Sequence, residues 1–355
     1  MSIEALRQKM RPPSEWPAGR REIALGIAAA AVAALLGAAL VSMEPAGRAT
    51  PNAHPQLAAA NPAAVTPAEL DAREAAAGPT GAPLLWRVMG PRATVYLFGS
   101  VHILRANMGW MDPRLYSAFD SANEVWFEVP DPKVTPHVKP LTQKAFASRP
   151  VLFNGLTDPE KVELAQALRP LDFDYDPDRA ARLRPEVAAG LVNAIANMAM
   201  GYQFDRGADM SLLSLARTNK KPVHGFETVD EQIGFLNAIS PQPHEDGTTA
   251  LKRALAIYAG RLSPDGEDIT TLAACWRAGD EACILRGVLT MRQTSPDEYD
   301  ILLRRRNARW VPRIEAMAQG TDTVFITVGA AHLVGPDGLV TQLRAAGYTV
   351  DRIDP

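Results

Sequence analysis

The chain has 355 residues, of which 47% are hydrophobic and 22% are charged, and its formal net charge is −3. This length and composition suit a globular protein of one or two domains with enough apolar residues for a core. The net charge is small and the basic residues form no long block, so the sequence does not indicate a nucleic-acid-binding protein.

The first predicted element is an apolar segment near the amino terminus. Residues 23–43 carry no charge, and 21 residues are about what a helix needs to cross a bilayer. Several arginines and a lysine lie in residues 1–22, which the positive-inside rule assigns to the cytoplasm. A cleaved signal peptide is the competing interpretation, but the segment is long for a signal core and no clear cleavage site follows it. We therefore expect a membrane anchor and a globular part outside the cytoplasm, in the periplasm.

An Ala/Pro-rich segment follows the expected anchor. Residues 44–83 contain no aromatic side chain and few β-branched ones. Such a segment cannot bury enough apolar area to fold by itself, so it is predicted to be a linker. The globular α/β domain is then expected to span residues 84–355.

The globular part begins with two strands joined by a turn. Leu84–Val88 and Thr94–Phe98 are separated by a short Gly/Pro-containing segment, which predicts a hairpin. The second strand leads into Gly99-Ser100-Val101-His102 and then a loop. A helix over residues 112–120, with Asp-Pro at its start, precedes the next strand at Glu124–Val129.

The same order returns at the carboxyl end of the chain. Strand Thr323–Val328 leads into Gly329-Ala330-Ala331-His332, followed by a helix at Leu339–Ala346 and a strand at Tyr348–Ile353. The succession of strand, Gly-x-x-His, helix and strand therefore occurs twice. This predicts an α/β fold with two related βαβ-type halves that form a mixed sheet, and with a large helical insertion between them.

The region between the halves shows mainly helical spacing of apolar residues. The predicted helices are Asp158–Leu168, Pro185–Met200, Asp209–Asn219, Asp230–Ala238, Thr248–Arg261, Asp268–Arg277, Glu281–Leu289 and Pro296–Ala318. One segment, residues 221–227, instead predicts a short buried strand that ends in a carboxylate. We expect the helices to pack on the sheet and partly cover its active edge.

The two histidines at the predicted strand ends are the first candidates for chemistry. In open α/β sheets, ligands bind at the carboxyl ends of the strands, so the fold can bring His102 and His332 to one site. Glu128 and Glu227 each end an apolar run. Imidazole and carboxylate groups suit Zn²⁺, Mn²⁺, Fe²⁺ or Co²⁺, which predicts a divalent metal site of unspecified identity. The same side chains could instead act without metal, as a general base and an orienting acid.

Two of the acidic candidates also have a structural interpretation. Asp209 stands where a helix should begin, so its default role is that of an N-cap. Glu227 could similarly cap the helix that begins near Asp230.

Arg306 and Asn307 are supporting candidates. Arg306 belongs to the run of arginines at 304–306, and such a run usually lies on a solvated helix face. A single arginine turned inward could bind a substrate carboxylate or orient Glu128.

The chain contains two cysteines, Cys275 and Cys283, on either side of a predicted turn. In an oxidising compartment they could form a disulfide, and two half-buried thiols are the alternative.

These motifs resemble those of the TraB/GumN family, which includes the Tiki proteins, and the resemblance runs from Trp86 to the end of the chain. The segments that carry it are residues 96–102, 127–129, 221–228 with Gln232, Arg306-Asn307, 328–333 and 338–350. The resemblance implies a two-halved α/β fold and, through the Tiki members, metal-dependent proteolysis in an extracytoplasmic setting. It also implies that His102, His332 and Glu128 form the active site.

The expected function is therefore that of an extracytoplasmic metal-dependent hydrolase, and among hydrolases a peptidase. His102, Glu128 and His332 are expected to hold a divalent metal (Mn, Co, Zn or Fe), and Glu227 is the fourth catalytic candidate. Asp209, Arg306 and Asn307 are expected to support the site or bind substrate.

Two alternatives remain: a metal-free His/Glu esterase-like hydrolase, and a non-catalytic protein that binds a peptide or small ligand at the cell surface. The expected partners are a peptide or protein substrate and the membrane, through the N-terminal helix, but no nucleic acid. A homodimer is left open.

Overall fold

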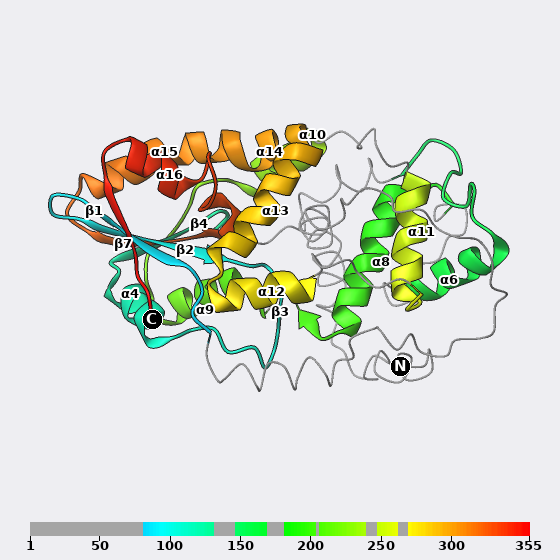
Figure 1. Cartoon of the computed structure of the whole chain (residues 1–355), viewed down its shortest axis with the longest axis horizontal. Helices are drawn as coiled ribbons and strands as arrows, with labels where there is room; N and C mark the ends of the chain where they lie inside the picture. Colours follow the sequence, from blue (N-terminus) through cyan, green and yellow to red (C-terminus); the bar gives the residue numbers. More distant parts are fainter. Residues whose placement is uncertain (1–80, 131–145, 169–180, 204–205, 239–246, 262–268) are drawn as a thin grey trace. The chain divides into compact units, whose positions relative to one another are not determined.

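The computed structural model describes six stretches of the chain, which belong to two units (Figure 1). The smaller unit contains residues 146–168, 181–201 and 247–261, and the larger contains 81–130, 202–203, 206–238 and 269–355. The predicted anchor at 23–43 and nearly all of the predicted linker at 44–83 lie outside the described residues. In the stretches that are described, no helix has both the length and the apolar character needed to cross a bilayer.

The larger unit is built on a six-stranded mixed sheet with strand order β6-β4-β7-β2-β1-β8. The strands are β1 Leu85–Met89, β2 Thr94–Ser100, β4 Glu124–Phe127, β6 Val223–Gly225, β7 Thr323–Gly329 and β8 Thr349–Arg352. Strands β6, β4, β7 and β2 are parallel to one another, and β1 is antiparallel to both β2 and β8. The predicted hairpin and the predicted mixed sheet are therefore confirmed.

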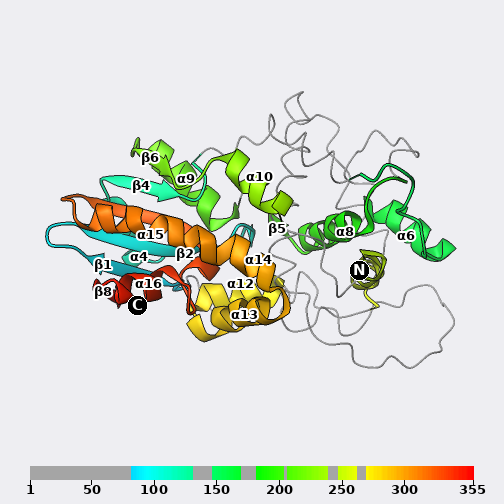
Figure 2. The same ribbon diagram turned by 90° about the horizontal axis from the view of Figure 1, so that it is seen from above.

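Helices cover both faces of this sheet (Figures 1 and 2). On one side lie α15 (Arg305–Ala318) and α16 (Leu339–Ala345), and on the other lie α4 (Pro113–Ser121) and α9 (Ala208–Thr218). Helix α4 begins where the sequence predicts it, because Asp112 accepts a hydrogen bond from Leu115 N at 3.0 Å and Pro113 occupies the first turn. Its Phe119 packs edge-on against Phe325 of β7 with ring centroids 5.4 Å apart.

The two predicted halves are present and interleaved. The first is β2-α4-β4 and the second is β7-α16-β8, and within each half the two strands run in the same direction. Strand β7 of the second half lies between β2 and β4 of the first. Neither half therefore forms a sheet of adjacent strands by itself.

The helical insertion supplies the smaller unit and several helices of the larger one. In the smaller unit, α6 (Asp158–Leu168), α8 (Pro185–Ala199) and α11 (Gly247–Tyr258) surround a core that includes Leu164, Val192 and Leu251. The larger unit also contains α10 (Val229–Ala238), α12 (Ile269–Ala278), α13 (Glu281–Thr294) and α14 (Pro296–Tyr299). Helix α6 has the predicted bounds, whereas the predicted helices at 185–200 and 248–261 extend too far at their carboxyl ends.

Two local features go beyond the predictions. The single helix predicted over Pro296–Ala318 is α14 and α15 with a π-helical segment, Asp300–Arg304, between them. The loop predicted after His102 contains a two-residue strand, β3 (Leu104–Arg105), which pairs antiparallel with β5 (Tyr202–Gln203). Two residues are too few for an alternating pattern, so the sequence carries no signal for this pair.

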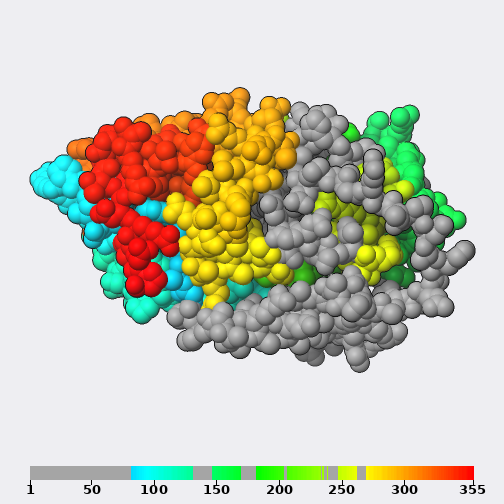
Figure 3. Space-filling view, in the orientation of Figure 1, coloured from blue at the N-terminus to red at the C-terminus, as the bar shows by residue number. Residues whose placement is uncertain are grey.

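The two cysteines form a disulfide between α12 and α13. On the face shown in Figure 3, these two helices lie beside the carboxyl-terminal segment. Arg352 connects the two regions, because its Nη2 donates to Gly279 O at 3.0 Å and its Nη1 lies 3.6 Å from Glu281. Helix α12 also contacts the first Gly-x-x-His motif, because the buried Trp276 Nε1 donates to Gly99 O at 2.6 Å.

Candidate functional site

The two Gly-x-x-His motifs lie side by side at the carboxyl ends of β2 and β7. The parallel register pairs Ser100 with Gly329, so both histidines follow at the same edge of the sheet. Glu128 follows β4, which is the other neighbour of β7, and its Oε1 accepts a hydrogen bond from Gly329 N at 2.7 Å. Three adjacent strands therefore deliver the three principal candidates, as the sequence predicts.

Glu227 also reaches this edge, although β6 ends two residues before it. The pairing between β6 and β4 continues beyond the strand, because Phe226 N donates to Phe127 O and Glu227 N donates to Glu128 O, at 3.0 and 2.9 Å. The Glu227 side chain is fully buried. It does not cap α10, since Thr228 and Glu231 form a capping box there, with Thr228 N donating to Glu231 Oε2 at 2.8 Å.

Arg306 joins the two glutamates and the second histidine. This arginine is buried, with 7% of its surface exposed. Its Nη2 donates to Glu128 Oε2 at 2.5 Å and to Glu227 Oε2 at 2.8 Å, and its Nε donates to Glu227 Oε1 at 2.9 Å. Its Nη1 donates to Leu302 O and lies 3.1 Å from His332 Nε2.

These contacts engage all five N–H groups of the Arg306 guanidinium. Of the two functions considered for an inward-facing arginine, the contacts support orientation of Glu128 and not capture of a substrate carboxylate. Arg304 and Arg305, by contrast, lie on a solvated helix face as expected. Their side chains are 56% and 69% exposed, and both pair with Asp300.

The charges around Arg306 keep both Glu128 and Arg306 ionised. Burial by itself would raise the pKa of Glu128, but the charge of Arg306, the two histidines and the N–H of Gly329 hold that pKa far below its usual range. Burial would also lower the pKa of Arg306, and the two carboxylates more than offset this, so that its pKa rises. The pair is therefore a carboxylate and a guanidinium throughout the physiological pH range.

His332 is buried and its orientation is fixed by Asn307. The Asn307 Oδ1 lies 2.7 Å from His332 Nδ1, while its Nδ2 donates to His332 O and Asp337 O at 3.1 and 2.8 Å. Because an amide oxygen only accepts, Nδ1 carries the proton and Nε2 presents a lone pair. Burial and then the charge of Arg306 lower the pKa of His332 to about 3, so its ring is neutral. The ring of Trp310 packs against it with centroids 4.5 Å apart.

His102 occupies a different environment, since its side chain is 47% exposed. Its Nδ1 lies 2.9 Å from Asp209 Oδ2. Partial burial of the ring would lower the pKa of His102, but the charge and the hydrogen bond of Asp209 raise it to about 9. The interpretation of Asp209 as an N-cap is wrong, because Gly207 occupies the N-cap of α9 and Asp209 lies within its first turn.

The donor set suits a divalent metal in residue type and orientation. Asp209 holds the Nδ1 of His102, and Asn307 holds the Nδ1 of His332. This arrangement is typical of histidines that bind metal through Nε2. His332 Nε2 and Glu128 Oε1 lie 3.7 Å apart, which suits two ligands of one ion.

His102 does not join these two donors at the distance of a closed metal site. Among the described residues, one group brings three potential ligand atoms within 4.8 Å of one another, and it consists of Cys275, Asp280 and Cys283. This group does not include the histidines, and its two cysteines form the disulfide. The lone pair of His332 that a metal would need also faces Arg306. His102, His332 and Glu128 thus have the chemistry of metal ligands. In this structure, however, the side chains of Glu128 and His332 contact the Arg306 guanidinium, and His102 lies too far from them to complete a metal site.

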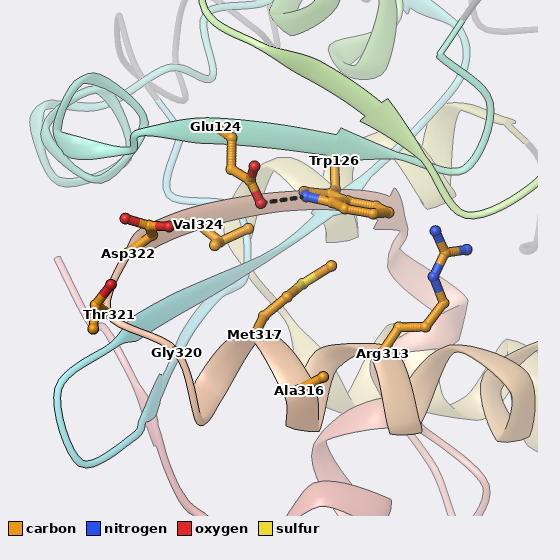
Figure 4. A pocket seen from close by; sticks show the side chains of 9 residues that line it. All are labelled: Glu124, Trp126, Arg313, Ala316, Met317, Gly320, Thr321, Asp322 and Val324. Atoms are coloured by element: carbon orange, nitrogen blue, oxygen red, sulfur yellow. Dashed lines mark hydrogen bonds between the residues drawn. The ribbon is translucent and has the colours of Figure 1, made fainter.

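An open hollow of about 400 Å³ lies elsewhere on the same unit (Figure 4). Glu124, Trp126 and Met317 line it, with Arg313 at one end and Asp322 at the other. Glu124 begins β4, whereas Glu128 follows the opposite end of that strand. This hollow is therefore not part of the histidine site.

Sequence reasoning missed two residues that shape the site: Gly207, which lies two positions before Asp209, and Trp310, which packs on His332. It noted Gln232 only as part of the family resemblance, and the Nε2 of this residue donates to Glu128 Oε2 at 3.3 Å. Trp310 lies four residues after Arg306 on α15, and this i, i+4 spacing was an available signal.

The chain is similar to a known protein family and to curated proteins. The family described as TraB/PrgY/gumN matches residues 84–352, which include every site residue named above. The chain is also 27% identical over 146 residues to the uncharacterized protein YbaP of Escherichia coli (strain K12) and equally to YbaP of Shigella flexneri. Each match covers 41% of this chain, and the chain spans about half the length of these curated relatives. No solved structure matches significantly. The match over most of the globular part shows that the chain belongs to the TraB/PrgY/gumN family.

Proposed function

We propose that this protein is an extracytoplasmic, membrane-anchored, metal-dependent hydrolase that acts on peptides. The observation that carries the proposal is the meeting of His102, His332 and Glu128 at adjacent parallel strand ends, with the Nδ1 of each histidine held by another side chain. Two oriented imidazoles and a carboxylate form a donor set for Zn²⁺, Mn²⁺, Fe²⁺ or Co²⁺. The anchor at residues 23–43 and the periplasmic location are part of the same proposal.

In this proposal His102, His332 and Glu128 hold the metal. The chemistry that a divalent ion supplies when bound in such a site is Lewis acidity, which activates water and polarises a carbonyl group. Glu128 suits the role of ligand better than that of general base, because Arg306 holds its pKa so low that it is a weak proton acceptor. Glu227 keeps Arg306 in place, and Arg306 in turn fixes the carboxylate of Glu128.

The second candidate function is that of a metal-free hydrolase, and two contacts favour it. Arg306 already faces the Nε2 of His332, and the half-exposed His102 already has a carboxylate partner in Asp209. In that version His102 transfers protons to and from the substrate, while neutral His332 and Glu128 stay in the network around Arg306.

Metal analysis of the purified full-length chain separates the two. We expect about one divalent ion per chain in the wild type and loss of the ion in the His102→Ala/His332→Ala variant. His224→Ala is the matched control, since His224 pairs with Glu124 at the other end of β4 and should retain the ion. Cleavage of a peptide library should stop in the double variant and on chelation, and should resume when metal is restored.

Each other outcome overturns part of the proposal. Histidine-dependent cleavage without metal, unaffected by chelator, would replace it with the metal-free hydrolase. Retention of a peptide or small ligand without turnover, again dependent on the histidines, would identify a binding protein. A topology reporter at the carboxyl terminus that is active only in the cytoplasm would overturn the proposed location.

A further inference from the structure

The two histidines of the site are held in place in different ways. Asn307, which holds His332, lies one residue after Arg306 on α15, the helix that directly precedes β7. Asp209, which holds His102, lies on α9, 107 residues farther along the chain and within the helical insertion. We propose that Asp209 is the positioning residue for His102 and that Gly207 is the residue that allows it to act. A catalytic use of the oriented His102 rests on the proposed function. The orientation of His102 by Asp209 does not depend on that function.

The contacts of Asp209 point to His102. Its Oδ2 lies 2.9 Å from His102 Nδ1. Its Oδ1 is buried and has no hydrogen-bond partner among the described residues. A buried carboxylate oxygen without a partner is costly, so a structural role alone does not account for this placement.

The backbone brings α9 unusually close to the first Gly-x-x-His motif. Ala208 N donates to Val101 O at 2.9 Å, which joins the start of the helix to the residue before His102. A Cβ atom on Gly207 would lie 2.3 Å from His102 O and 2.7 Å from Asp209 Oδ1. The φ angle of Gly207 is −50°, which other residues also adopt. Glycine is therefore required here by the close approach and not by the backbone conformation.

The positioning determines which nitrogen of His102 faces the site. A carboxylate can only accept, so in the neutral ring the bond to Asp209 places the proton on Nδ1 and leaves the lone pair of Nε2 for metal or substrate. Asn307 imposes the same tautomer on His332 without adding a charge. The two motifs thus present the same ring atom, one backed by a charged acceptor and one by a neutral acceptor.

The rival explanation is that Asp209 only stabilises α9, because an acidic side chain in the first turn interacts favourably with the helix dipole. Glu281 likewise lies in the first turn of α13 and does not contact a histidine in the described contacts, so Glu281→Gln is the control. Gly287, also in α13, has no atom within 4 Å of a Cβ position, and Gly287→Ala is the control for Gly207→Ala.

Histidine ring ¹⁵N spectra of the full-length chain test the proposal without any assay of activity. Above the pKa of His102, the wild type should show a proton on Nδ1 of His102. In Asp209→Ala and Gly207→Ala this signal should be lost in favour of the Nε2–H form that unconstrained histidine prefers. Asp209→Asn should retain it, because the amide oxygen still accepts. His332 should be unchanged in all three variants, and both control variants should match the wild type.

An unchanged His102 tautomer in Asp209→Ala would overturn the proposal, and so would a change in Glu281→Gln. If Gly207→Ala fails to fold, comparison of Asp209→Ala with Asp209→Asn still tests whether Asp209 positions His102. Under the proposed function, Asp209→Ala should also weaken the affinity for Zn²⁺ by about 10- to 100-fold. Absence of metal binding in the wild type, together with the predicted spectra, would overturn the proposed function and leave the positioning role intact.

Discussion

Removal of the Arg306 guanidinium is the most informative test of the buried network. Arg306→Leu leaves Glu128 and Glu227, whose side chains are 11% and 0% exposed, without their shared cation. Breaking a buried ion pair by removing one partner costs about 3–5 kcal/mol, because an uncompensated charge stays buried. Among the described cations, Glu227 then keeps the half-exposed Arg309, whose Nη2 lies 3.2 Å away. We therefore expect Arg306→Leu to lower the free energy of unfolding by about 3–5 kcal/mol.

Such a loss lowers the melting temperature by roughly 6 to 20 °C for a domain of this size. Arg305→Leu is the matched control, since Arg305 is the preceding residue, is 69% exposed and pairs with Asp300. An exposed pair of this kind contributes about 1 kcal/mol or less. Chemical denaturation of both variants, followed by circular dichroism, gives the two free energies of unfolding.

The pH dependence of Arg306→Leu provides a second check. Without the guanidinium, burial dominates and raises the pKa of Glu128 above its unfolded value, so protonation relieves the buried charge. The stability deficit of the variant should therefore shrink as the pH is lowered from 7 toward 5. A loss no greater than that of Arg305→Leu, or a deficit that grows on acidification, would refute the assignment of Arg306 as the counter-ion of the cluster.

Three further predictions follow from contacts around the site. Reduction of the Cys275–Cys283 disulfide, which spans eight positions of the chain, should lower the free energy of unfolding by about 2.5 kcal/mol, measured by denaturation with and without reductant. Trp276→Phe should cost about 1–3 kcal/mol in the same assay, because Gly99 O loses its buried donor, and a loss near zero would contradict that contact. The pKa of Glu128 is lowered in the folded state, so its contribution to stability is present above the unfolded value of about 4.5 and is lost as the pH falls below it. Denaturation between pH 6 and 3 should show a decline that is shallower in Glu128→Gln than in the wild type.

The arrangement of His102, Glu128 and His332 could be predicted because strand direction carries the information. Glu128 directly follows an apolar run and each histidine follows one through a Gly-x-x-His motif, and the carboxyl ends of neighbouring parallel strands share one edge of a sheet. The repeated order of strand, Gly-x-x-His, helix and strand also predicts the two halves. The sequence does not show that β7 lies between β2 and β4, because that depends on which strand edges pair.

The sequence raises an inward-facing Arg306 that orients Glu128 as one possibility but cannot select it, because the rotation of its helix is not encoded in simple periodicity. A regular helix over Pro296–Ala318 predicts one set of faces, and the π-helical turn at Asp300–Arg304 changes the face on which every later residue lies. The partnership of Asp209 with His102 was equally hidden, since it depends on the approach of two backbones at Gly207. By contrast, Thr228 and Glu231 form a capping box whose Thr-x-x-Glu spacing is visible in the sequence.

The central position of β7 has a consequence for the order in which the protein can fold during synthesis. Strands β2 and β4 do not pair with each other, and each has β7 as a neighbour, although β7 begins at residue 323 of 355. Until that strand emerges, the β1–β2 hairpin and the β4–β6 pair each keep an open edge that can join another chain. The last tenth of the chain must therefore insert into the middle of the sheet before His102 and Glu128 acquire His332 as a neighbour. A truncated chain that lacks β7 loses the shared edge altogether, however intact its first half is.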